Sequence, residues 1–508
     1  MVSITDRKMQ PVEDVNQMII YSTVIEKSSG YEHLNDTNDT GNAQRFLLQF
    51  GKRVRYISTW QTWLIWNGNC WELDTKQQIA IWFKASIRAA IKTGGDQLKA
   101  MEKFKKEPKK TPEGKAYQDA LSFLGYLKGS LNTGKIKAGI ESAQSENVTN
   151  DHKALNKVKS YLVCNNGTVD VASGLLQESK QSHLITSQVE TAYNEEATCP
   201  KWMQFLKEIF ITEDGRPDEA LIEYMQKLFG CAITGLAPRE NIFPIFYGSG
   251  GNGKSTFLKV IQTILGGEIA YACEPDFLCE SKSNQHPASL ATLYGKKIVF
   301  AQEPPPGSKL NTSLVKSITG CDQMTARLLY QNPWSFYPEC LLLMSTNEKP
   351  TVKETTEGIW RRVRLIPFLA TFAADTAKRN MAQVLLEEES EGILCWIIAG
   401  AKTYLTDGLL CPERIKNETE KYQNEEDIVS RWLEDCCTIH TDTVVKSKAS
   451  DVQTSFKKWC ELNNLRSSKN DLADGLRKRG IVTLKSGINY WCKIKLRNPD
   501  DDGPNEGQ

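Results

Sequence analysis

The 508-residue chain is too long for one ordinary hydrophobic core, so roughly three folding units are expected. Hydrophobic residues make up 40% and charged residues 25% of the chain, values typical of a soluble globular protein. Lys and Arg number 63 against 62 Asp and Glu, for a net charge of +1. This balance excludes a basic protein overall and restricts any nucleic-acid footprint to a local channel or module.

Cysteine spacing and hydropathy indicate the cellular compartment of the protein. The 14 cysteines include no Cys-x-x-Cys pair, which favours reduced, mostly buried thiols over a zinc ribbon. The first ten residues contain no apolar signal core, and the longest apolar runs, such as residues 393–401, are too short to span a membrane. We therefore expect a cytoplasmic protein, in a bacterial host if a phage encodes it.

The first 200 residues predict an arm and one mixed domain. Residues 1–38 are polar and turn-rich, which indicates a flexible arm. Residues 39–200 predict an α+β domain with aromatic, strand-like runs, two helical patterns and a strand–turn–strand pattern at 161–174. The lysine-rich stretch 103–115 could contact nucleic-acid phosphates, but its two prolines and one glycine favour a solvated loop.

The remaining chain predicts two further units and a tail. Residues 201–385 alternate strands and helices, which indicates an α/β unit with a mostly parallel sheet. Residues 386–497 end in three helical patterns and two strands, the order of a winged helix, and the acidic residues 498–508 predict a disordered tail. The basic run at 477–479 could flank a DNA groove or belong to a protein-docking helix, and the two alternatives are equally favoured.

A glycine-rich stretch, GSGGNGKST, begins at position 248 and fits G-x-x-x-x-G-K-[ST] at every defined position. An apolar run at 242–247 predicts a strand before it, and residues 254–265 predict a helix after it. Backbone N–H groups in such a turn can cradle phosphates at a helix N-terminus, whereas the alternative is a surface turn. We expect a nucleoside triphosphate to be bound by Gly248, Ser249, Gly250, Gly251, Asn252, Gly253, Lys254, Ser255 and Thr256. Lys254 would neutralise the β- and γ-phosphates, and the Ser255 hydroxyl would complete a Mg²⁺ shell.

Two later apolar strands end in polar residues. The run KKIVFAQE places Glu303 at the carboxyl end of a strand, beside the phosphate loop if the sheet is parallel. A carboxylate there suits Mg²⁺ or the attacking water, whereas a solvent-facing glutamate is the alternative. The run CLLLMSTN delivers Asn347 to the same edge, as a γ-phosphate sensor or as a turn former with equal weight. Arg361 and Arg362 precede a further apolar strand and are either surface charge or an arginine finger.

These segments, in this order, resemble the helicase core of superfamily 3 within the AAA+ ATPases. The resemblance extends to the phage/plasmid primase–helicase family, which includes poxvirus-type helicase-primases. It rests on GSGGNGKSTFLKVI, HPASLATLYGKKIVFAQE, KLNTSLVKSITGCDQMTARLLYQNPWSFYP, LLLMSTNEKP and EGIWRRVRLIPF. The fold it implies is multidomain α/β: an N-terminal α+β domain, a central AAA+ P-loop ATPase with a mostly parallel sheet over 201–385, and a C-terminal winged helix.

The resemblance also implies roles for individual residues. It implies a hexameric ring with ATP and Mg²⁺ between subunits, Lys254, Ser255, Glu303 and Asn347 acting in one subunit and an arginine finger in the next. Because the family's finger directly precedes the strand, Arg362 is preferred to Arg361. Position 302 is Gln where many P-loop ATPases carry a second acid, which leaves open whether Glu303 alone serves both Mg²⁺ and water.

The segment between Glu303 and Asn347 resembles the family's pore hairpin. MTARLLY and PWSFYP would be its strands, with Gln331 and Asn332 near the tip. Lys316 and Arg327 are the cations expected to face DNA phosphates. Trp334 or Tyr330 could stack on a base, although hairpin aromatics more often pack on their own strands.

The predicted function is an ATP-driven replicative DNA helicase of a phage or mobile element. An origin-binding initiator that melts DNA without processive unwinding is the alternative, and a small-molecule P-loop kinase is disfavoured by the hairpin-sized segment. The expected partners are single-stranded or forked DNA, further copies of the chain, and a separate primase or other replication proteins. The residues before the core show no clear pair of metal-binding carboxylates with a histidine, so primer synthesis by this chain is not expected.

Overall fold

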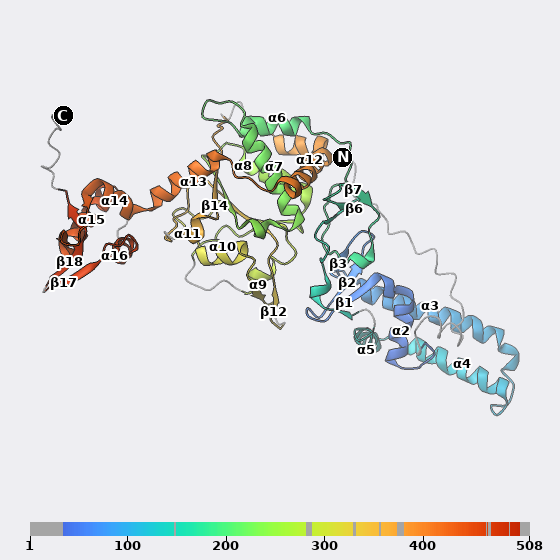
Figure 1. Cartoon of the computed structure of the whole chain (residues 1–508). Coiled ribbons are helices and arrows are strands. Elements are labelled where there is room, and N and C mark those ends of the chain that lie inside the picture. Colours follow the sequence, from blue (N-terminus) through green and yellow to red (C-terminus); the bar gives the residue numbers. More distant parts are fainter. Residues whose placement is uncertain are drawn as a thin grey trace.

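The computed structural model describes residues 34–146, 149–280, 287–328, 332–354, 357–372, 380–463, 465, 469–486 and 488–497. Figure 1 shows a central sheet with helices around it, N-terminal elements on one side and C-terminal elements on the other. This arrangement confirms a multidomain α/β chain with an N-terminal α+β region. The expected tail over 498–508 and most of the expected arm over 1–38 lie outside the described residues.

The N-terminal region begins with a helix, ahead of its first strands. The segment AQRFLLQF lies in α2 (Asp39–Phe50), because the Asn38 side chain accepts a hydrogen bond from the Gly41 N–H and Phe46 and Leu47 are buried. The other elements are η2 (Gly51–Arg53), β1 (Val54–Ile57), β2 (Thr62–Trp66), β3 (Trp71–Leu73), α3 (Gln78–Ala100), η3 (Glu102–Phe104), α4 (Pro112–Gly129), α5 (Thr133–Ala143), β4 (Thr149–Asn150) and η4 (His152–Ala154). The strand order is β3-β2-β1-β4, with β4 parallel to β1.

A second small sheet leads into the central body. The expected strand–turn–strand pattern forms the antiparallel meander β5 (Tyr161–Cys164), β6 (Gly167–Asp170) and β7 (Leu175–Gln177), which η5 (Gln181–His183) follows. The next helices are α6 (Pro200–Ile209) and α7 (Glu219–Thr234), followed by η6 (Ala237–Glu240). Val169 and Val189 share one buried cluster with these helices, so residues 161–193 pack into the central body.

The central sheet is parallel throughout, as predicted. Its order is β14 (Val363–Pro367), β8 (Phe243–Tyr247), β13 (Leu341–Thr346), β10 (Ile298–Gln302) and β9 (Ala270–Cys273). Alternate strand residues face two cores: Phe246 and Leu343 pack on one side, and Ile245 and Leu342 pack on the other. The first face is covered by α6, α7, α8 (Lys254–Leu265) and α12 (Met381–Asp407). The second face carries α9 (Pro287–Ala291), α10 (Thr312–Thr319), the hairpin β11 (Met324–Ala326) and β12 (Trp334–Phe336), and α11 (Glu357–Trp360).

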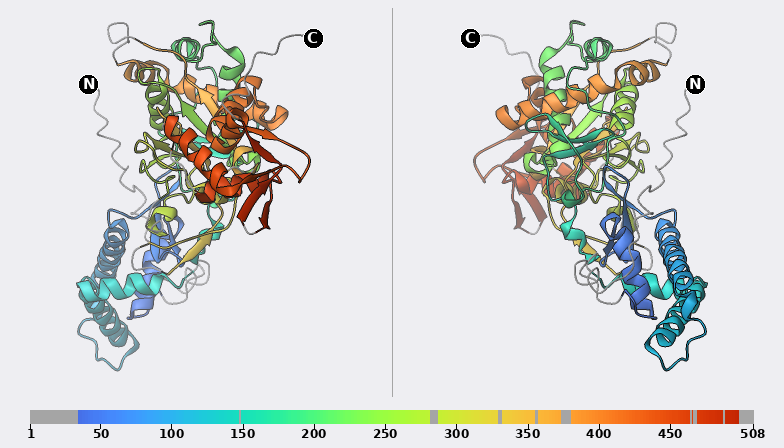
Figure 2. Two further views of the ribbon diagram at one scale, coloured as in Figure 1. Left: turned by 90° about the vertical axis from the view of Figure 1, so that its left-hand side faces the viewer. Right: turned by 90° about the vertical axis from the view of Figure 1, so that its right-hand side faces the viewer.

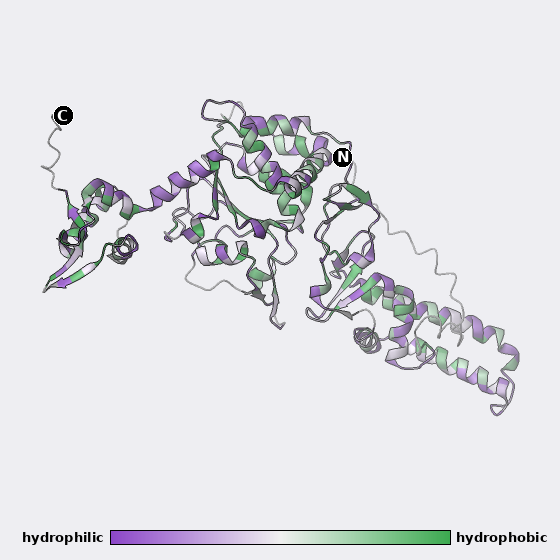
Figure 3. Ribbon diagram, viewed as in Figure 1, coloured by the Kyte–Doolittle hydropathy of each residue, from purple (hydrophilic) through white to green (hydrophobic). Residues whose placement is uncertain are grey.

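The chain leaves the central body through a polar helix. Helix α12 packs against α7 and α8, so the boundary expected after residue 385 falls inside a helix of the central body. Helix α13 (Glu413–Glu426) follows and is drawn largely as hydrophilic (Figure 3). The C-terminal elements depart from the expected order of three helices before two strands, because two short strands follow the first helix. The elements are α14 (Ile428–Cys436), β15 (Cys437–Ile439), β16 (Lys446–Lys448), α15 (Ala449–Leu462), α16 (Lys469–Lys478), β17 (Thr483–Ser486), β18 (Ile488–Cys492) and β19 (Ile494–Leu496). They have a separate core that includes Trp432 and Phe456. No helix of the described part of the chain has the length and apolarity needed to cross a membrane.

Candidate functional site

The glycine-rich turn lies at the carboxyl edge of the parallel sheet. Strand β8 ends at Tyr247 and α8 begins at Lys254, so the turn between them is the connection that the pattern predicted. Gly251 and Gly253 have φ angles of +74° and +89°, which favour glycine over any side chain. The first turn of α8 has N–H groups that no helix carbonyl can accept, and they point toward this edge. The edge therefore offers the backbone donors and dipole that bind an anion.

Neighbouring segments hold the turn in shape. The Asn252 side chain is buried and donates a hydrogen bond to the Phe368 carbonyl oxygen at 3.3 Å. The Phe372 N–H donates to the Gly251 carbonyl oxygen at 2.9 Å. A Cβ added at Gly253 would come within 2.5 Å of Ile209. The chain after β14 and the end of α6 thus fix the turn, and the phosphate-loop pattern predicts neither contact.

Lys254 lies inside the turn. Only 4% of this residue is exposed, and its Nζ donates to Gly248 O at 2.6 Å, Asn252 Oδ1 at 3.1 Å and Asn347 Oδ1 at 3.1 Å. Burial lowers the pKa of the Lys254 amine, and the nearby Glu303 carboxylate opposes that shift. The structure therefore brings Asn347, expected from a separate strand, into direct contact with the lysine.

Glu303 follows β10 in a strained conformation. Its φ is +50°, a left-handed value that costs a non-glycine residue on the order of 1–3 kcal/mol. Its N–H donates to the Ser345 carbonyl oxygen at 2.8 Å, which ties the end of β10 to β13. The Glu303 side chain is exposed, as is the Ser255 side chain at the start of α8. Because carboxylate and hydroxyl oxygens are ligands that Mg²⁺ accepts, these groups fit a metal-bound phosphate chain at this edge.

The arginine pair lies at the opposite edge of the sheet. Strand β14 is parallel to β8, and its first residue, Val363, pairs with Phe243 at the start of β8. Arg362 is 8% exposed, and its guanidinium donates to Thr319 Oγ1 at 3.1 Å and to the Gly358 carbonyl oxygen at 2.5 Å. Burial lowers the pKa of Arg362. Arg361 beside it is exposed. Neither arginine is at the edge that carries the glycine-rich turn of its own chain.

The expected hairpin is present, and its residues fall into different environments. Strands β11 and β12 pair antiparallel, and Arg327 and Asn332 are exposed near their free ends. Tyr330 and Gln331 lie outside the described residues. Lys316 lies on α10 instead, where its Nζ forms an ion pair with Glu354 at 2.9 Å. Arg327 therefore remains open to solvent, whereas Lys316 would have to leave a carboxylate to contact a phosphate.

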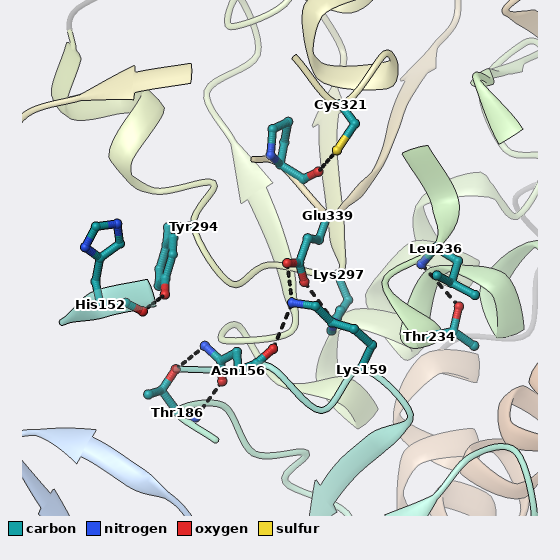
Figure 4. Close-up of polar contacts among 11 residues, drawn as sticks. His152, Asn156, Lys159, Thr186, Thr234, Leu236, Tyr294, Lys297, Cys321 and Glu339 are labelled. Atoms are coloured by element: carbon teal, nitrogen blue, oxygen red, sulfur yellow. Dashed lines mark hydrogen bonds and ion pairs between the residues drawn. The ribbon is translucent and has the colours of Figure 1, made fainter. Parts of the chain in front are cut away.

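Trp334 packs at the base of this hairpin against the N-terminal region. Its ring lies 5.7 Å from Trp60, 5.1 Å from His152 and 5.1 Å from Tyr294, and only 6% of Trp334 is exposed. The His152 ring nitrogen Nε2 is 3.2 Å from the Ser335 carbonyl oxygen. Tyr294 donates its hydroxyl to the His152 carbonyl oxygen at 2.8 Å, as Figure 4 shows. Trp334 thus joins the two regions and is buried away from any base.

A polar contact reinforces this junction beyond the hairpin. Glu339 forms ion pairs with Lys159 of the N-terminal region and with Lys297 at 3.5 Å (Figure 4). Lys159 also donates to the Asn156 carbonyl oxygen at 2.8 Å. Burial lowers the pKa of Lys297, and Glu339 opposes the shift. The residues of this junction lie far apart in the chain, so no local pattern could have indicated it.

Two family models match the chain. Residues 43–211 match the family described as "D5 N terminal like", and residues 246–362 match a family of unknown function (DUF5906). The second match spans the glycine-rich turn, Glu303, Asn347 and the arginine pair.

Several viral proteins are similar in sequence. "Putative helicase L207/L206" of Acanthamoeba polyphaga mimivirus is 25% identical over 404 residues, which cover 74% of this chain and 41% of that protein. "Putative helicase 184R" of Invertebrate iridescent virus 6 is 24% identical over 53% of this chain and 27% of that protein. "Putative primase C962R" of African swine fever virus (strain Badajoz 1971 Vero-adapted) is 22% identical over 44% of this chain and 25% of that protein. The chain thus spans less than half the length of these relatives.

Among solved structures, the apo A form of the NrS-1 C terminal region covers 88% of this chain at 11% identity, with a TM-score of 0.46. That score is too low to establish a shared fold over this length. The sequence matches alone relate the chain to helicase- and primase-named proteins of large DNA viruses. They support the primase–helicase resemblance that the motifs indicated.

Proposed function

Because this chain has a D5 N terminal like segment and helicase- and primase-named viral relatives, we propose that it is the ATP-driven motor of a replicative DNA helicase. The relatives come from large DNA viruses, so the proposal concerns a viral-type replication protein and does not depend on a phage origin. The observation that carries the proposal is the contact between Lys254 Nζ and Asn347 Oδ1 at 3.1 Å, beside Glu303.

Each side chain at this edge of the sheet would have a separate role in binding or hydrolysing ATP. Lys254 would exchange its hydrogen bonds to the loop carbonyls for contacts with the β- and γ-phosphates. Asn347 would contact the γ-phosphate and so couple its presence to the position of β13. Ser255 and Glu303 would hold Mg²⁺, which shields the charge of the phosphates. Glu303 would also orient water, since Gln302 has no charge to offer. The parallel strand order supports this proposal, because ligands of such sheets bind at the carboxyl ends of the strands.

A ring of subunits accounts for the arginine pair. An arginine at the amino edge of β14 cannot reach the nucleotide of its own subunit without crossing the sheet, but it could reach one on a neighbouring subunit. Arg362 was preferred from the resemblance, yet it is hydrogen-bonded within its own chain, whereas Arg361 is exposed. We therefore keep both arginines as candidates for the finger.

One pair of measurements tests the function. ATP hydrolysis is expected in the presence of Mg²⁺ and is expected to rise on addition of single-stranded DNA. Strand displacement on forked and on blunt duplexes then separates a travelling helicase, which unwinds the forked substrate, from an initiator that melts DNA without unwinding it. Absence of Mg²⁺-dependent hydrolysis by the wild-type protein would contradict the proposal.

A further inference from the structure

We propose that the tip of the α3–α4 arm binds the phosphate backbone of double-stranded DNA. The tip comprises residues 99–115, at the end of α3, through η3 and into the first turn of α4. Its seven lysines are Lys99, Lys103, Lys105, Lys106, Lys109, Lys110 and Lys115, against three glutamates. The whole chain carries a net charge of only +1, so positive charge is concentrated here. The inference rests on the proposed function, and it assigns the duplex part of the substrate to a separate surface.

The lysines of the tip are available to a ligand. All seven are exposed. Lys99 is 3.9 Å from Asp96, and within the described residues no ion pair is formed by the other six. This pattern differs from that of Lys316, Lys349 and Lys416, which are each paired with a glutamate. An anionic partner could therefore contact the tip without first displacing a carboxylate.

The tip is an ordered turn. Thr111 caps α4 by accepting a hydrogen bond from the Gly114 N–H at 3.1 Å, and its hydroxyl donates to the Pro108 carbonyl oxygen at 2.8 Å. A Cβ added at Gly114 would overlap that same oxygen, so the turn closes tightly on itself. Lys105, Lys106, Lys109 and Lys110 are therefore held on a compact surface, which reduces the entropy lost when they bind.

The arm carries this charge away from the rest of the molecule. Helix α3 has 23 residues, which corresponds to a length of about 35 Å at 1.5 Å per residue. Figures 1 and 2 show the far ends of α3 and α4 pointing away from the central sheet in every view. The tip can thus touch DNA that lies outside the central body.

The chemistry of the tip favours duplex backbone over other anionic partners. Phe104 is half-buried, and Lys103 Nζ lies 4.8 Å from its ring centre, so the tip offers little aromatic surface on which an unpaired base could stack. None of the large apolar side chains exposed in the described residues lies between 99 and 115, so an anionic membrane would gain no apolar insertion. Lysines bind phosphate as point charges without reading sequence. The expected partner is therefore duplex DNA of any sequence.

The test neutralises the centre of the tip in the full-length protein. The variant carries Lys105→Gln, Lys106→Gln, Lys109→Gln and Lys110→Gln. A matched control loses four exposed lysines without a described ion pair from scattered helices through Lys128→Gln, Lys137→Gln, Lys259→Gln and Lys458→Gln. Binding of a labelled blunt duplex and of a labelled single strand is measured by fluorescence anisotropy between 50 and 200 mM salt. For the tip variant, the log–log salt slope on duplex is expected to fall by about 0.9 for each lysine that contacts a phosphate.

Single-strand binding and DNA-independent ATPase are expected to stay within about twofold of wild type in both variants, and the control should keep the wild-type duplex slope. A tip variant with the wild-type affinity and slope on duplex would overturn the inference while leaving the motor function intact. Loss of binding to phosphatidylserine vesicles with unchanged duplex binding would overturn it in favour of a membrane. Failure of the wild-type protein to bind any DNA would instead contradict the proposed function itself.

Discussion

At the scale of single residues, Lys254 combines a functional position with a structural cost. Burial lowers the pKa of its amine, so the folded state binds this proton less tightly than the unfolded chain does. Such a group destabilises the folded protein at neutral pH, and the penalty is relieved only as pH rises above the folded-state pKa. A charge kept at this cost is typical of a site that needs it for a ligand.

Replacement of Lys254 by Met is therefore expected to separate function from stability. ATP hydrolysis should fall by at least about 10²-fold, the loss typical when one preorganised electrostatic partner is removed. The melting temperature measured by calorimetry without nucleotide should stay the same or rise, because the buried charge is gone. Normal hydrolysis by a folded Lys254→Met protein would show that the glycine-rich turn is not the hydrolytic site.

Glu303→Gln is expected to keep nucleotide binding and slow the turnover. The amide preserves the size of the side chain and its φ of +50°, but it removes the only carboxylate at the end of β10, since Gln302 precedes it. Binding of a fluorescent ATP analogue and release of phosphate should be measured on the same preparation. Loss of binding in a folded variant would assign Glu303 mainly to the metal, and unchanged turnover would remove it from the site.

At the scale of elements, the packing of α7 on α12 brings their backbones into contact. Gly230 and Gly400 lie at this crossing, and a Cβ added at Gly400 would overlap the Gln226 carbonyl oxygen. Glycine is required here by close approach, since backbone atoms cannot give way as a side chain can. The two helices cover the face of the sheet that supports α8, so their spacing affects the position of the glycine-rich turn.

Gly400→Ala is expected to lower the free energy of unfolding by about 1–3 kcal/mol, because overpacking forces the helices apart. Gly125→Ala provides the control: Gly125 is also helical, but nothing lies within 4 Å of an added Cβ. This substitution should stabilise the protein by about 0.5–1 kcal/mol through helix propensity. Thermal or urea unfolding measures both changes, and equal effects from the two substitutions would contradict the packing argument.

The junction at the hairpin base is also expected to have a functional role. Trp60→Ala removes the N-terminal ring that packs on Trp334, so the hairpin should lose part of its support. DNA-stimulated ATPase is expected to fall several-fold, while the DNA-independent rate stays near wild type. Trp66→Ala serves as the control, because Trp66 packs on Trp71 inside the N-terminal region. An equal loss of DNA-stimulated ATPase in both variants would contradict a coupling between the N-terminal region and the hairpin.

At the scale of the whole molecule, the opposite positions of Lys254 and the arginine pair invite a test of assembly. Mixtures of Lys254→Ala with Arg361→Ala subunits, or with Arg362→Ala subunits, can form interfaces that have an intact lysine on one side and an intact arginine on the other. The mixture with the true finger variant should hydrolyse ATP faster than either parent, since a finger is typically worth about 10³–10⁵ in rate. Subunit exchange must be shown first by energy transfer between labelled preparations.

The two mixtures have different meanings. Recovery with Arg361→Ala alone would make the exposed arginine the finger and leave Arg362 as a structural link between α10 and α11. Recovery with Arg362→Ala would mean that its hydrogen bonds to Thr319 and Gly358 are exchanged in the assembled ring. If exchange is demonstrated and neither mixture recovers, no arginine of this pair acts on a neighbouring subunit.

The sequence by itself determined the parallel α/β centre and the strand–turn–helix position of the glycine-rich stretch. Both are local signals: apolar runs set the strands, and glycines at positive φ with Lys254 after them set the turn. It also indicated Glu303 and Asn347, because both follow buried strands directly. Helix α2 is not indicated by the sequence, because its aromatic residues also suit a strand and the polar residues before it, including the cap Asn38, are typical of turns.

Only the tertiary structure decided which of these residues meet. The contact between Lys254 and Asn347 depends on β13 lying next to β8, and the position of the arginine pair depends on β14 being parallel to β8. Trp60 and His152 bury Trp334, although they lie far from it in the chain. The hydrogen bond between His152 and Ser335 likewise joins residues more than 180 positions apart. Strand order and domain contact arise from packing of whole faces, and a linear pattern of residue types does not specify which faces will pack together.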